Sequence, residues 1–470
     1  MSASGTPRPL GPTLSVDDPF SGAVAYSRPW ATAGQIDGVL DAARAGARAA
    51  AAMSVEDRVA LCLRATEALE RDVDAVAAEI TAEMGKPLGQ AKGEMGGMAK
   101  RARHMASIAV ESLRDVVIGG DPTLERRIVR APKGVVLAMP AWNYPLLTAV
   151  NVVIPAVLAG NAVVLKHSPR SPSVGDRFAK AFRDAGAPAE LVQALHCDHA
   201  ASERIVGDAR VDHVAFTGST FGGHRIQAAA KDRLIDIGLE LGGNDAAYVA
   251  ADADLAKAVE GIVDGACYNA GQSCCAVERV YVHRSLYDQF VEACLPLMRA
   301  YVMGDPRDAA TNMGPIAQPW HVGELEAQVQ DAVRRGAKLL FGGKKAIVGG
   351  KGRFFEPTVL VDVPDDAEVM SKESFGPLLP IAPVDDDEHA LRLMNDDELG
   401  LTASVWTTDR ERANRMAQRL EVGTVYMNRC DALDPALPWT GWKESGKGST
   451  LSVLGFEHLT HPKAINFRIG

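Results

Sequence analysis

Two adjacent cysteines, Cys274 and Cys275, are the residues of this chain whose type and position best suit covalent chemistry. They close the stretch Gly-Gln-Ser-Cys-Cys (residues 271–275), between a run that predicts a helix (252–267) and a run that predicts a strand (279–282). Small residues at such a junction permit a tight turn and the close approach of another molecule. A cysteine there can act as a thiolate nucleophile, and the alternative is a pair of buried cysteines that pack as small apolar side chains.

An asparagine lies between two prolines in Pro-Ala-Trp-Asn-Tyr-Pro (residues 140–145), directly after a predicted strand. The prolines fix the backbone on both sides. The side-chain amide of Asn143 can therefore donate an N–H to a developing oxyanion. A turn asparagine that bonds its own backbone explains the same pattern.

Three further stretches place glycines and carboxylates at predicted strand ends or turns. Phe-Thr-Gly-Ser-Thr-Phe-Gly-Gly (216–223) opens a helix, which indicates either a phosphate site or ordinary strand–helix punctuation. Glu-Leu-Gly-Gly-Asn (240–244) makes Glu240 either a general base or a solvated or ion-paired acid. In Glu-Ser-Phe-Gly-Pro (373–377), an acid and an aromatic residue can meet a ribose and a heterocycle, or the stretch is only a turn.

Composition limits the partners and the compartment. The chain has 470 residues, of which 47% are hydrophobic, enough for two or three domains, and its formal net charge is -10. This acidity disfavours nucleic acid and anionic membrane as partners. Seven cysteines without a CxxC pair indicate no disulfide framework and no metal site, so we expect a reduced, cytoplasmic setting. Residues 1–13 lack the apolar core of a signal peptide, and prolines, glycine and asparagines interrupt the apolar stretch 134–165, which excludes a membrane span.

Three kinds of predicted element must position the reactive residues. Helical patterns over 36–53, 55–84 and 88–113 indicate a scaffold. A first series of strands that alternate with helices is predicted at 134–139, 162–166, 191–195, 211–216 and 235–239. A second series is predicted at 246–249, 280–283, 338–341, 358–361, 379–382 and 403–406. The alternation predicts two doubly wound, parallel α/β sheets, which bind ligands at the carboxyl ends of their strands.

A β-hairpin is predicted over residues 116–129, around a Gly-Gly-Asp-Pro turn, and a last strand at 464–468. We expect these strands to pair as an arm that reaches off the main body. Arms of this kind commonly add strands across a subunit boundary, so we expect a homodimer or homotetramer.

Five motifs in this order resemble the NAD(P)-dependent aldehyde dehydrogenase superfamily. They are Trp-Asn-Tyr-Pro at 142, Phe-Thr-Gly-Ser at 216, Glu-Leu-Gly-Gly at 240, Gly-Gln-Ser-Cys at 271 and Glu-Ser-Phe-Gly-Pro at 373. The resemblance extends from about residue 17 to residue 467. It implies an aldehyde-dehydrogenase-like α/β fold. The implied domains are a cofactor-binding domain (1–113 and 133–239), a catalytic domain (240–445) and an oligomerisation arm (114–132 and 446–470).

The resemblance also implies a role for each motif. Cys274 would be the nucleophile and Glu240 the general base, and Asn143 with the backbone N–H of Cys274 would form the oxyanion hole. An aldehyde would pass through a thiohemiacetal and a thioester on Cys274, with hydride going to NAD or NADP and water activated by Glu240 releasing the acid. The implied cofactor contacts are Ala141, Trp142, Lys166, Ser168, Gly218, Ser219, Gly223, Leu241, Glu373 and Phe375.

Three stretches depart from the family pattern. The common Lys-Pro-Ser-Glu reads Lys-His-Ser-Pro-Arg (166–170), so the Glu that binds the adenosine ribose of NAD is absent. With Lys166 and Arg170 near the place of a 2′-phosphate, we expect NADP to be accepted and NAD also to be used. The common Phe-Gly-Gly reads Trp-Thr-Gly (439–441), and the common Glu-Glu before Phe-Gly-Pro reads Lys-Glu (372–373).

The substrate tunnel is expected to be aromatic. The chain resembles bacterial succinate-semialdehyde dehydrogenases in part, but two positions where those enzymes often carry tunnel arginines hold Asn151 and Tyr268. With Tyr144 and Trp439 as further walls, we expect a neutral or cationic aldehyde. The alternative is a semialdehyde whose carboxylate binds an arginine from elsewhere, with Arg429 a candidate.

Two other functions fit the same motifs less well. A CoA-acylating or phosphorylating semialdehyde dehydrogenase often lacks the general base, and Glu240 argues against it. A catalytically silent binding protein on this fold would not need Cys274, Glu240 and Asn143 together.

Overall fold

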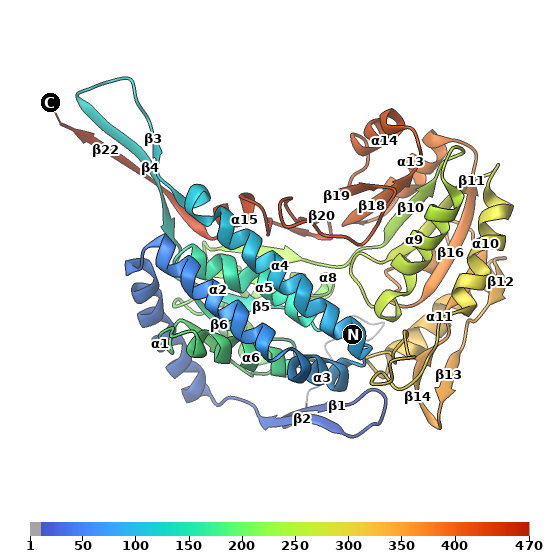
Figure 1. The fold of residues 1–470 in the computed structure, drawn as a ribbon, viewed down its shortest axis with the longest axis horizontal. Helices are drawn as coiled ribbons and strands as arrows, with labels where there is room; N and C mark the ends of the chain where they lie inside the picture. Colours follow the sequence, from blue (N-terminus) through green and yellow to red (C-terminus); the bar gives the residue numbers. More distant parts are fainter. Residues whose placement is uncertain (1–10, 470) are drawn as a thin grey trace.

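The computed structural model describes residues 11–469 (Figure 1). In it, the strands predicted from residue 134 onward form a mostly parallel sheet. In spatial order its strands are β21 (Gly446–Lys447), β9 (Asp236–Glu240), β8 (His213–Thr217), β5 (Val135–Met139), β6 (Ala162–Leu165) and β7 (Val192–Ala194). All pairs are parallel except β21 with β9. The five strands predicted for the first series are confirmed, and every residue of β5 and β6 is buried, as expected for strands covered on both faces.

Helices from two parts of the chain pack around this sheet. Those between its strands are α5 (Pro145–Leu158), α6 (Pro172–Asp184), α7 (His199–Val206) and α8 (Thr220–Ala229). Those from the N-terminal part are α1 (Ala33–Ala52), α2 (Val55–Arg71), α3 (Val73–Met84) and α4 (Leu88–Leu113). Within the described residues, no helix is long and apolar enough to cross a membrane.

The prediction of one helix over residues 55–84 is wrong, because the chain breaks at Asp72. The φ of Asp72 is -95° and its ψ is 13°, which leaves the helical region. The Asp72 carboxylate pairs with Arg177 of α6 at 3.0 Å, and Glu79 of α3 pairs with the same guanidinium. A tertiary ion-pair cluster therefore divides α2 from α3 where the local helical pattern is continuous.

A second sheet forms the other lobe, on the right of Figure 1. In spatial order its strands are β12 (Lys338–Phe341), β15 (Thr358–Val361), β16 (Leu378–Val384), β11 (Val277–His283), β10 (Asp245–Val249), β18 (Thr402–Trp406) and β19 (Thr424–Met427). Only the pair of β12 with β15 is antiparallel. The helices of this lobe are α9 (Leu255–Cys267), α10 (Tyr287–Arg299), α11 (His321–Arg334), α12 (Glu368–Ser371), α13 (Asp387–Asn395) and α14 (Arg410–Ala417).

The sequence pattern missed several short strands. They are β1 (Thr13–Asp17), β2 (Val24–Pro29), β13 (Lys345–Val348), β14 (Lys351–Phe355), β17 (Leu399–Gly400), β19, β20 (Trp442–Lys443) and β21. Most are brief and partly exposed, so their partner strands rather than an apolar run decide that they form. The expectation for residues 1–13 falls almost wholly outside the described residues.

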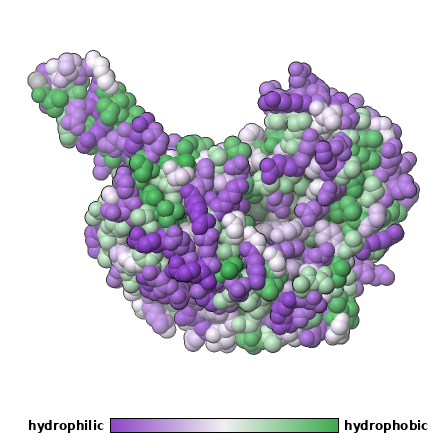
Figure 2. Space-filling model, viewed as in Figure 1, coloured by the Kyte–Doolittle hydropathy of each residue, from purple (hydrophilic) through white to green (hydrophobic). Residues whose placement is uncertain are grey.

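The predicted arm is confirmed as a three-stranded sheet that projects from the body (Figure 1). Strand β22 (Thr460–Arg468) runs antiparallel along all of β4 (Leu124–Pro132), and β3 (Val116–Val117) pairs with the other edge of β4. Apolar side chains stand among polar ones on its surface (Figure 2), and Val117 is 76% and Phe467 52% exposed.

A buried asparagine fastens the root of the arm to the first sheet. Asn161 is fully buried in the loop before β6. Its Oδ1 accepts the Gly134 N–H at 2.8 Å, and its Nδ2 donates to the carbonyls of Ala156 at 3.2 Å and Leu459 at 3.0 Å. Gly134 precedes β5, and Leu459 precedes β22.

The Asn161→Ala variant tests this fastening. It removes the partners of the Gly134 N–H and the Leu459 carbonyl, and a buried polar group left unpaired costs about 1–3 kcal/mol. We therefore expect the free energy of unfolding in urea, at fixed protein concentration, to fall by roughly 2–4 kcal/mol. The control Asn414→Ala, on the exposed face of α14, should change it by less than about 0.5 kcal/mol. Equal effects of the two substitutions would contradict the role of Asn161.

Candidate active site

A strained turn delivers the two cysteines between α9 and β11. It is a 3-10 turn, η1 (Tyr268–Gly271), in which Asn269 and Ala270 have φ values of 53° and 56°. Gly271 follows with φ +71°, and a Cβ added there would lie 2.2 Å from the carbonyl oxygen of Gly376. Only glycine fits the third position, Asn269 tolerates the left-handed region, and Ala270 is held there against its preference.

Side-chain amides hold this turn in place. Asn269 Nδ2 donates to the Gln272 carbonyl at 3.1 Å and to the Asn143 carbonyl at 3.2 Å. Gln272 Nε2 donates back to the Asn269 carbonyl at 3.0 Å, and its Oε1 accepts the Ala317 N–H at 2.8 Å. The turn that carries the cysteines is thereby fixed to the loop that carries Asn143.

The two cysteines differ in access. Both line a cavity of about 850 Å³, but only Cys274 is partly exposed. Cys275 is buried, and its Sγ donates to Asp431 Oδ1 at 2.9 Å. The contact with Cys274 and burial hold the pKa of the Cys275 thiol well above its usual range. Of the pair, Cys274 is therefore the more accessible to a ligand, and the thiol of Cys275 is buried and bonded to Asp431.

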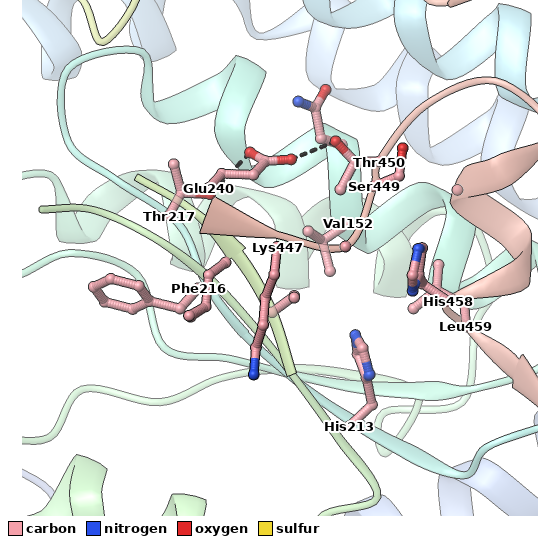
Figure 3. A pocket seen from close by; sticks show the side chains of 16 residues that line it. Val152, His213, Phe216, Thr217, Glu240, Lys447, Ser449, Thr450, His458 and Leu459 are labelled. Carbon is pink, nitrogen blue, oxygen red and sulfur yellow. Dashed lines mark hydrogen bonds between the residues drawn. The ribbon is translucent and has the colours of Figure 1, made fainter. Parts of the chain in front are cut away.

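Glu240 ends β9 and lines the same cavity as Cys274. Its Oε2 accepts the Thr217 hydroxyl at 3.2 Å, and its Oε1 accepts the Thr450 hydroxyl (Figure 3). Burial raises the pKa of the Glu240 carboxyl, and the two hydroxyls and Arg101 partly offset this effect. A carboxyl with a raised pKa takes a proton from water more readily near neutral pH than an exposed one.

A second, smaller cavity lies beside Glu240, with His213 and His458 on its wall (Figure 3). Its volume is about 30 Å³, enough for about one water molecule. Of these two cavities beside Glu240, the larger one, which Cys274 lines, is the one with room for a substrate.

Asn143 and Trp142 stand between β5 and α5. Asn143 is 4% exposed, and its side-chain amide has no hydrogen-bond partner in the part of the chain that the structure describes. Its N–H groups can therefore turn toward a ligand. The ring centroids of Trp142 and Phe375 lie 5.6 Å apart in an edge-to-face contact. This contact joins a residue of the first lobe to a residue of the second.

The glycine-rich stretch after β8 is built for close packing. Ser219 caps α8 by accepting the Gly222 N–H at 3.1 Å. A Cβ added at Gly218 would lie 2.5 Å from the Phe216 ring, and one at Gly223 would lie 2.7 Å from the Leu241 side chain. These residues bring the N-terminus of α8 close to the end of β9. Backbone N–H groups at a helix N-terminus are suited to bind a phosphate.

A buried acid on β11, the strand that pairs with β16, fixes the loop before β16 that carries Glu373. Glu278 of β11 accepts the N–H groups of Ser374 at 2.5 Å and Phe375 at 2.9 Å. Glu373 accepts the Gly243 N–H at 3.2 Å, and burial raises the pKa of both carboxyls. The sequence analysis missed Glu278, although a glutamate inside an apolar strand was a visible signal.

The remaining expected cofactor contacts lie at the carboxyl ends of β5 and β6. The Ala141 carbonyl accepts the Thr148 hydroxyl at 3.2 Å, and Ser168 Oγ accepts the Arg170 N–H at 3.3 Å. Lys166 is 5% exposed, and among residues 11–469 its ammonium has neither an ion-pair nor a hydrogen-bond partner. An unpaired buried ammonium suits ribose hydroxyls or a phosphate.

The expected role of Arg170 is wrong. Its guanidinium donates to the side chain and the carbonyl of Asp17 in β1, and the residue is 8% exposed. An arginine engaged in this way is not available to a 2′-phosphate, so Lys166 is the cation that remains of the expected pair.

The residues fit a dinucleotide. Lys166 offers unused donors, Glu373 offers unused acceptors, and Ser219 marks a helix N-terminus. Such groups are typical of sites for ribose hydroxyls and a pyrophosphate. Within the described part of the chain, no cluster of three or more His, Cys, Asp or Glu side chains is suited to a metal ion.

The walls of the large cavity include the expected Tyr144, Tyr268 and Trp439. They also include Arg101 of α4, a helix that the sequence analysis treated as scaffold only. Asn151 and Tyr268 indeed leave the two usual positions without arginine, but Arg101 supplies a buried cation from a third position, and the candidate Arg429 lines the cavity as well. The visible signal was an arginine on the apolar, buried face of a helix.

Known proteins resemble this chain over almost its whole length. The profile described as "Aldehyde dehydrogenase family" matches residues 9–465. The NAD(P)+ succinate semialdehyde dehydrogenase Sad of Escherichia coli is 35% identical over 452 residues, which cover 95% of this chain and 96% of that protein. The glutarate-semialdehyde dehydrogenase of Pseudomonas putida is 33% identical over 450 residues, covering 95% and 92%.

Solved structures agree as well. The crystal structure of an E. coli NADP dependent enzyme matches with a TM-score of 0.94 at 31% identity, covering 97% of this chain and 95% of that one. The chain therefore belongs to the aldehyde dehydrogenase family, and it is an NAD(P)-dependent oxidoreductase that converts an aldehyde to a carboxylic acid.

Proposed function

We propose that the chain performs this oxidation with Cys274 as nucleophile, Glu240 as general base and Asn143 as oxyanion donor. One observation supports the assignment above others: Cys274 and Glu240 line the same cavity, and Asn269 ties the cysteine turn to Asn143. Cys274 and Glu240 thus share one cavity, and the loop that carries Asn143 is bonded to the turn that carries Cys274.

Each group has a distinct task. The Cys274 thiolate attacks the carbonyl carbon, and the resulting oxyanion accepts N–H groups from the Asn143 side chain and the Cys274 backbone. One such donor contributes about 3 kcal/mol to the transition state in comparable sites. When bound, NAD or NADP supplies the acceptor for the hydride. Glu240 then removes a proton from water, which attacks the thioester on Cys274 and releases the acid.

The cofactor contacts are proposed at the junction of the lobes. Lys166 and Ser168 would bind the adenosine ribose, and Gly218 and Ser219 would bind the pyrophosphate at the start of α8. Glu373 would bind the nicotinamide ribose. The contacts of Ala141, Trp142, Gly223, Leu241 and Phe375 would shape the groove around them. Because position 169 is proline and not glutamate, we expect both NADP and NAD to be used.

Water is the proposed acceptor of the acyl group. The carboxyl of Glu240 has hydroxyl partners on both oxygens and faces the cavity that Cys274 lines. A transfer to CoA or phosphate does not need a base at this place, so the position of Glu240 favours hydrolysis.

Two substrate classes follow from different observations. The aromatic residues Tyr144, Tyr268 and Trp439 favour a neutral or cationic aldehyde. The names of the relatives, which act on succinate semialdehyde and glutarate semialdehyde, favour an aldehyde with a carboxylate at its other end.

We also infer a homodimer, or a homotetramer built from dimers, in the cytoplasm. Residues 1–113 with 133–239 would bind the cofactor, 240–445 would supply the catalytic residues, and 114–132 with 446–470 would join subunits. The exposed apolar residues of the arm support the last assignment, because burying them against a second copy would remove them from water.

Cysteine substitutions test the assignment of the nucleophile. We expect Cys274→Ala to lower the rate of cofactor reduction by roughly 10³-fold or more, because it removes the attacking atom. The matched variant Cys275→Ala loses only the thiol bonded to Asp431 and should stay within tenfold of the natural chain. Absorbance of the reduced cofactor measures both rates. Loss of activity in Cys275→Ala with activity retained in Cys274→Ala would reverse the assignment.

Glu240→Gln separates the two halves of the reaction. Hydride leaves before water attacks, so the variant should give a burst of about one reduced cofactor per site and then stall. The glutamine keeps the size of the side chain but accepts no proton. Stopped-flow absorbance follows the burst. Normal steady-state turnover would show that another group activates the water.

Substitution of the arm tests the subunit contact. Phe467→Asp places a charge on the exposed apolar edge of β22, and deletion of residues 463–470 removes most of that strand. Light scattering should then give a smaller mass than for the intact chain. Ile347→Asp, at a still more exposed apolar position on β13, is the control and should leave the mass unchanged. A monomeric intact chain would refute the proposal.

A further inference from the structure

We propose that Arg101 binds a carboxylate at the far end of the aldehyde, so that the substrate is an ω-carboxylated aldehyde. This inference rests on the proposed function of the cavity that Cys274 and Glu240 line. It deepens that function by naming the substrate class and the residue that selects it.

Arg101 reaches the cavity from α4, which packs along α5. The residue is 9% exposed and lies on the buried face of α4, where most neighbours are alanine and methionine. The cavity that it lines is the one that holds Cys274 and Glu240. A charged side chain is rare on such a helix face unless a partner satisfies it.

The guanidinium of Arg101 is only partly satisfied. Its Nη1 donates to Asn151 Oδ1 at 3.0 Å and, at the limit of hydrogen-bond length, to the Leu147 carbonyl at 3.5 Å. Within residues 11–469, Nε and Nη2 have no hydrogen-bond partner, and no carboxylate lies within ion-pair distance of the group. The guanidinium of Arg101 therefore has unused N–H donors at Nε and Nη2, and the residue lines the cavity.

Other deeply buried arginines of the chain show the usual solution. Arg58 donates to three backbone carbonyls, those of Leu158, Ala50 and Met53. Arg279 forms an ion pair with Asp397 at 3.4 Å and donates to the Asn244 carbonyl. Arg101 differs because its missing partner would have to come from the cavity.

The acids near Arg101 are engaged with other donors. Glu94 forms a buried ion pair with Lys86 and accepts the Leu146 N–H at 2.8 Å. Asp431 accepts the Cys275 thiol, and Glu240 accepts two threonine hydroxyls. A carboxylate on the substrate is thus the group that completes the guanidinium, which matches the two oxygens of a carboxylate in two parallel hydrogen bonds.

Asn151 acts as a positioning residue in this scheme. It is 4% exposed on α5, and its Oδ1 fixes one nitrogen of the guanidinium. Its short side chain leaves the space beside α5 to an arginine that arrives from α4. The aromatic walls would then enclose the carbon chain between the aldehyde and the carboxylate.

A cationic substrate is the competing class, since Glu260 and Asp264 also line this cavity. Both are exposed, so water screens their charge, and Lys257 adds an opposite charge on the same wall. Arg101 is buried, and an interaction with it is screened far less.

Specificity constants test the proposal. In the natural chain we expect succinate or glutarate semialdehyde to exceed both butanal and 4-aminobutanal by at least tenfold in kcat/KM. In Arg101→Met, the ratio of the constants for the carboxylated aldehyde and butanal should fall about 100-fold, mainly through a higher KM, because a buried charge pair is lost. Arg101→Lys keeps the positive charge but not the planar guanidinium, so its ratio should lie between those of the natural chain and Arg101→Met.

Arg429→Met is the matched control, since Arg429 is an exposed arginine on the same cavity. It should change the ratio by less than about threefold. If Arg101→Met does not fold, the preference of the natural chain and the ratio in Arg101→Lys decide the question.

Two results would overturn the proposal: a natural chain that prefers butanal or 4-aminobutanal, or variants at Arg101 that lose activity equally on charged and neutral aldehydes. Neither result touches the proposed oxidation itself. That function fails only if the natural chain reduces no cofactor with any of the aldehydes.

Discussion

The site depends on a backbone constraint, the run of three residues with positive φ from Asn269 to Gly271. Ala270 is neither glycine nor asparagine, so the turn stores strain that buried side-chain bonds from Asn269 and Gln272 must offset. The turn redirects the chain between α9 and β11, and it leaves Cys274 partly exposed in the cavity while the buried Cys275 thiol donates to Asp431.

The same turn links the two lobes. Asn269 bonds the Asn143 loop of the first lobe, and Trp142 of that loop meets Phe375 of the second. Glu278 holds the Phe375 loop through two backbone N–H groups. Each link is buried or partly buried, so the groups proposed to act on one substrate are fixed relative to one another before it arrives. Pre-organisation of this kind is how an enzyme lowers the cost of assembling its transition state.

The sequence predicted the structure best where burial of a strand or helix imposes a regular pattern of apolar residues. The alternation of strands and helices predicted the parallel sheets, and the ordered motifs around Asn143, Glu240 and Cys274 indicated the family. The predictions were wrong where a residue far away in the sequence determines the local structure or the partner of a side chain. The break at Asp72 depends on Arg177, and Arg170 is occupied by Asp17, a residue 153 positions away. Arg101 was missed for a different reason, since its signal was local: a charge on the apolar face of a helix is uncommon and indicates a partner.

Acyl transfer through Cys274 is the central claim, and trapping the thioester tests it most directly. The Glu240→Gln variant can be mixed with cofactor and a carboxylated aldehyde, quenched in acid and digested, and the peptide that holds both cysteines can be fragmented in a mass spectrometer. The account predicts a mass increase equal to the acyl group on Cys274 and none on Cys275. An acyl group on Cys275, or reduced cofactor formed without any acylated cysteine, would contradict it.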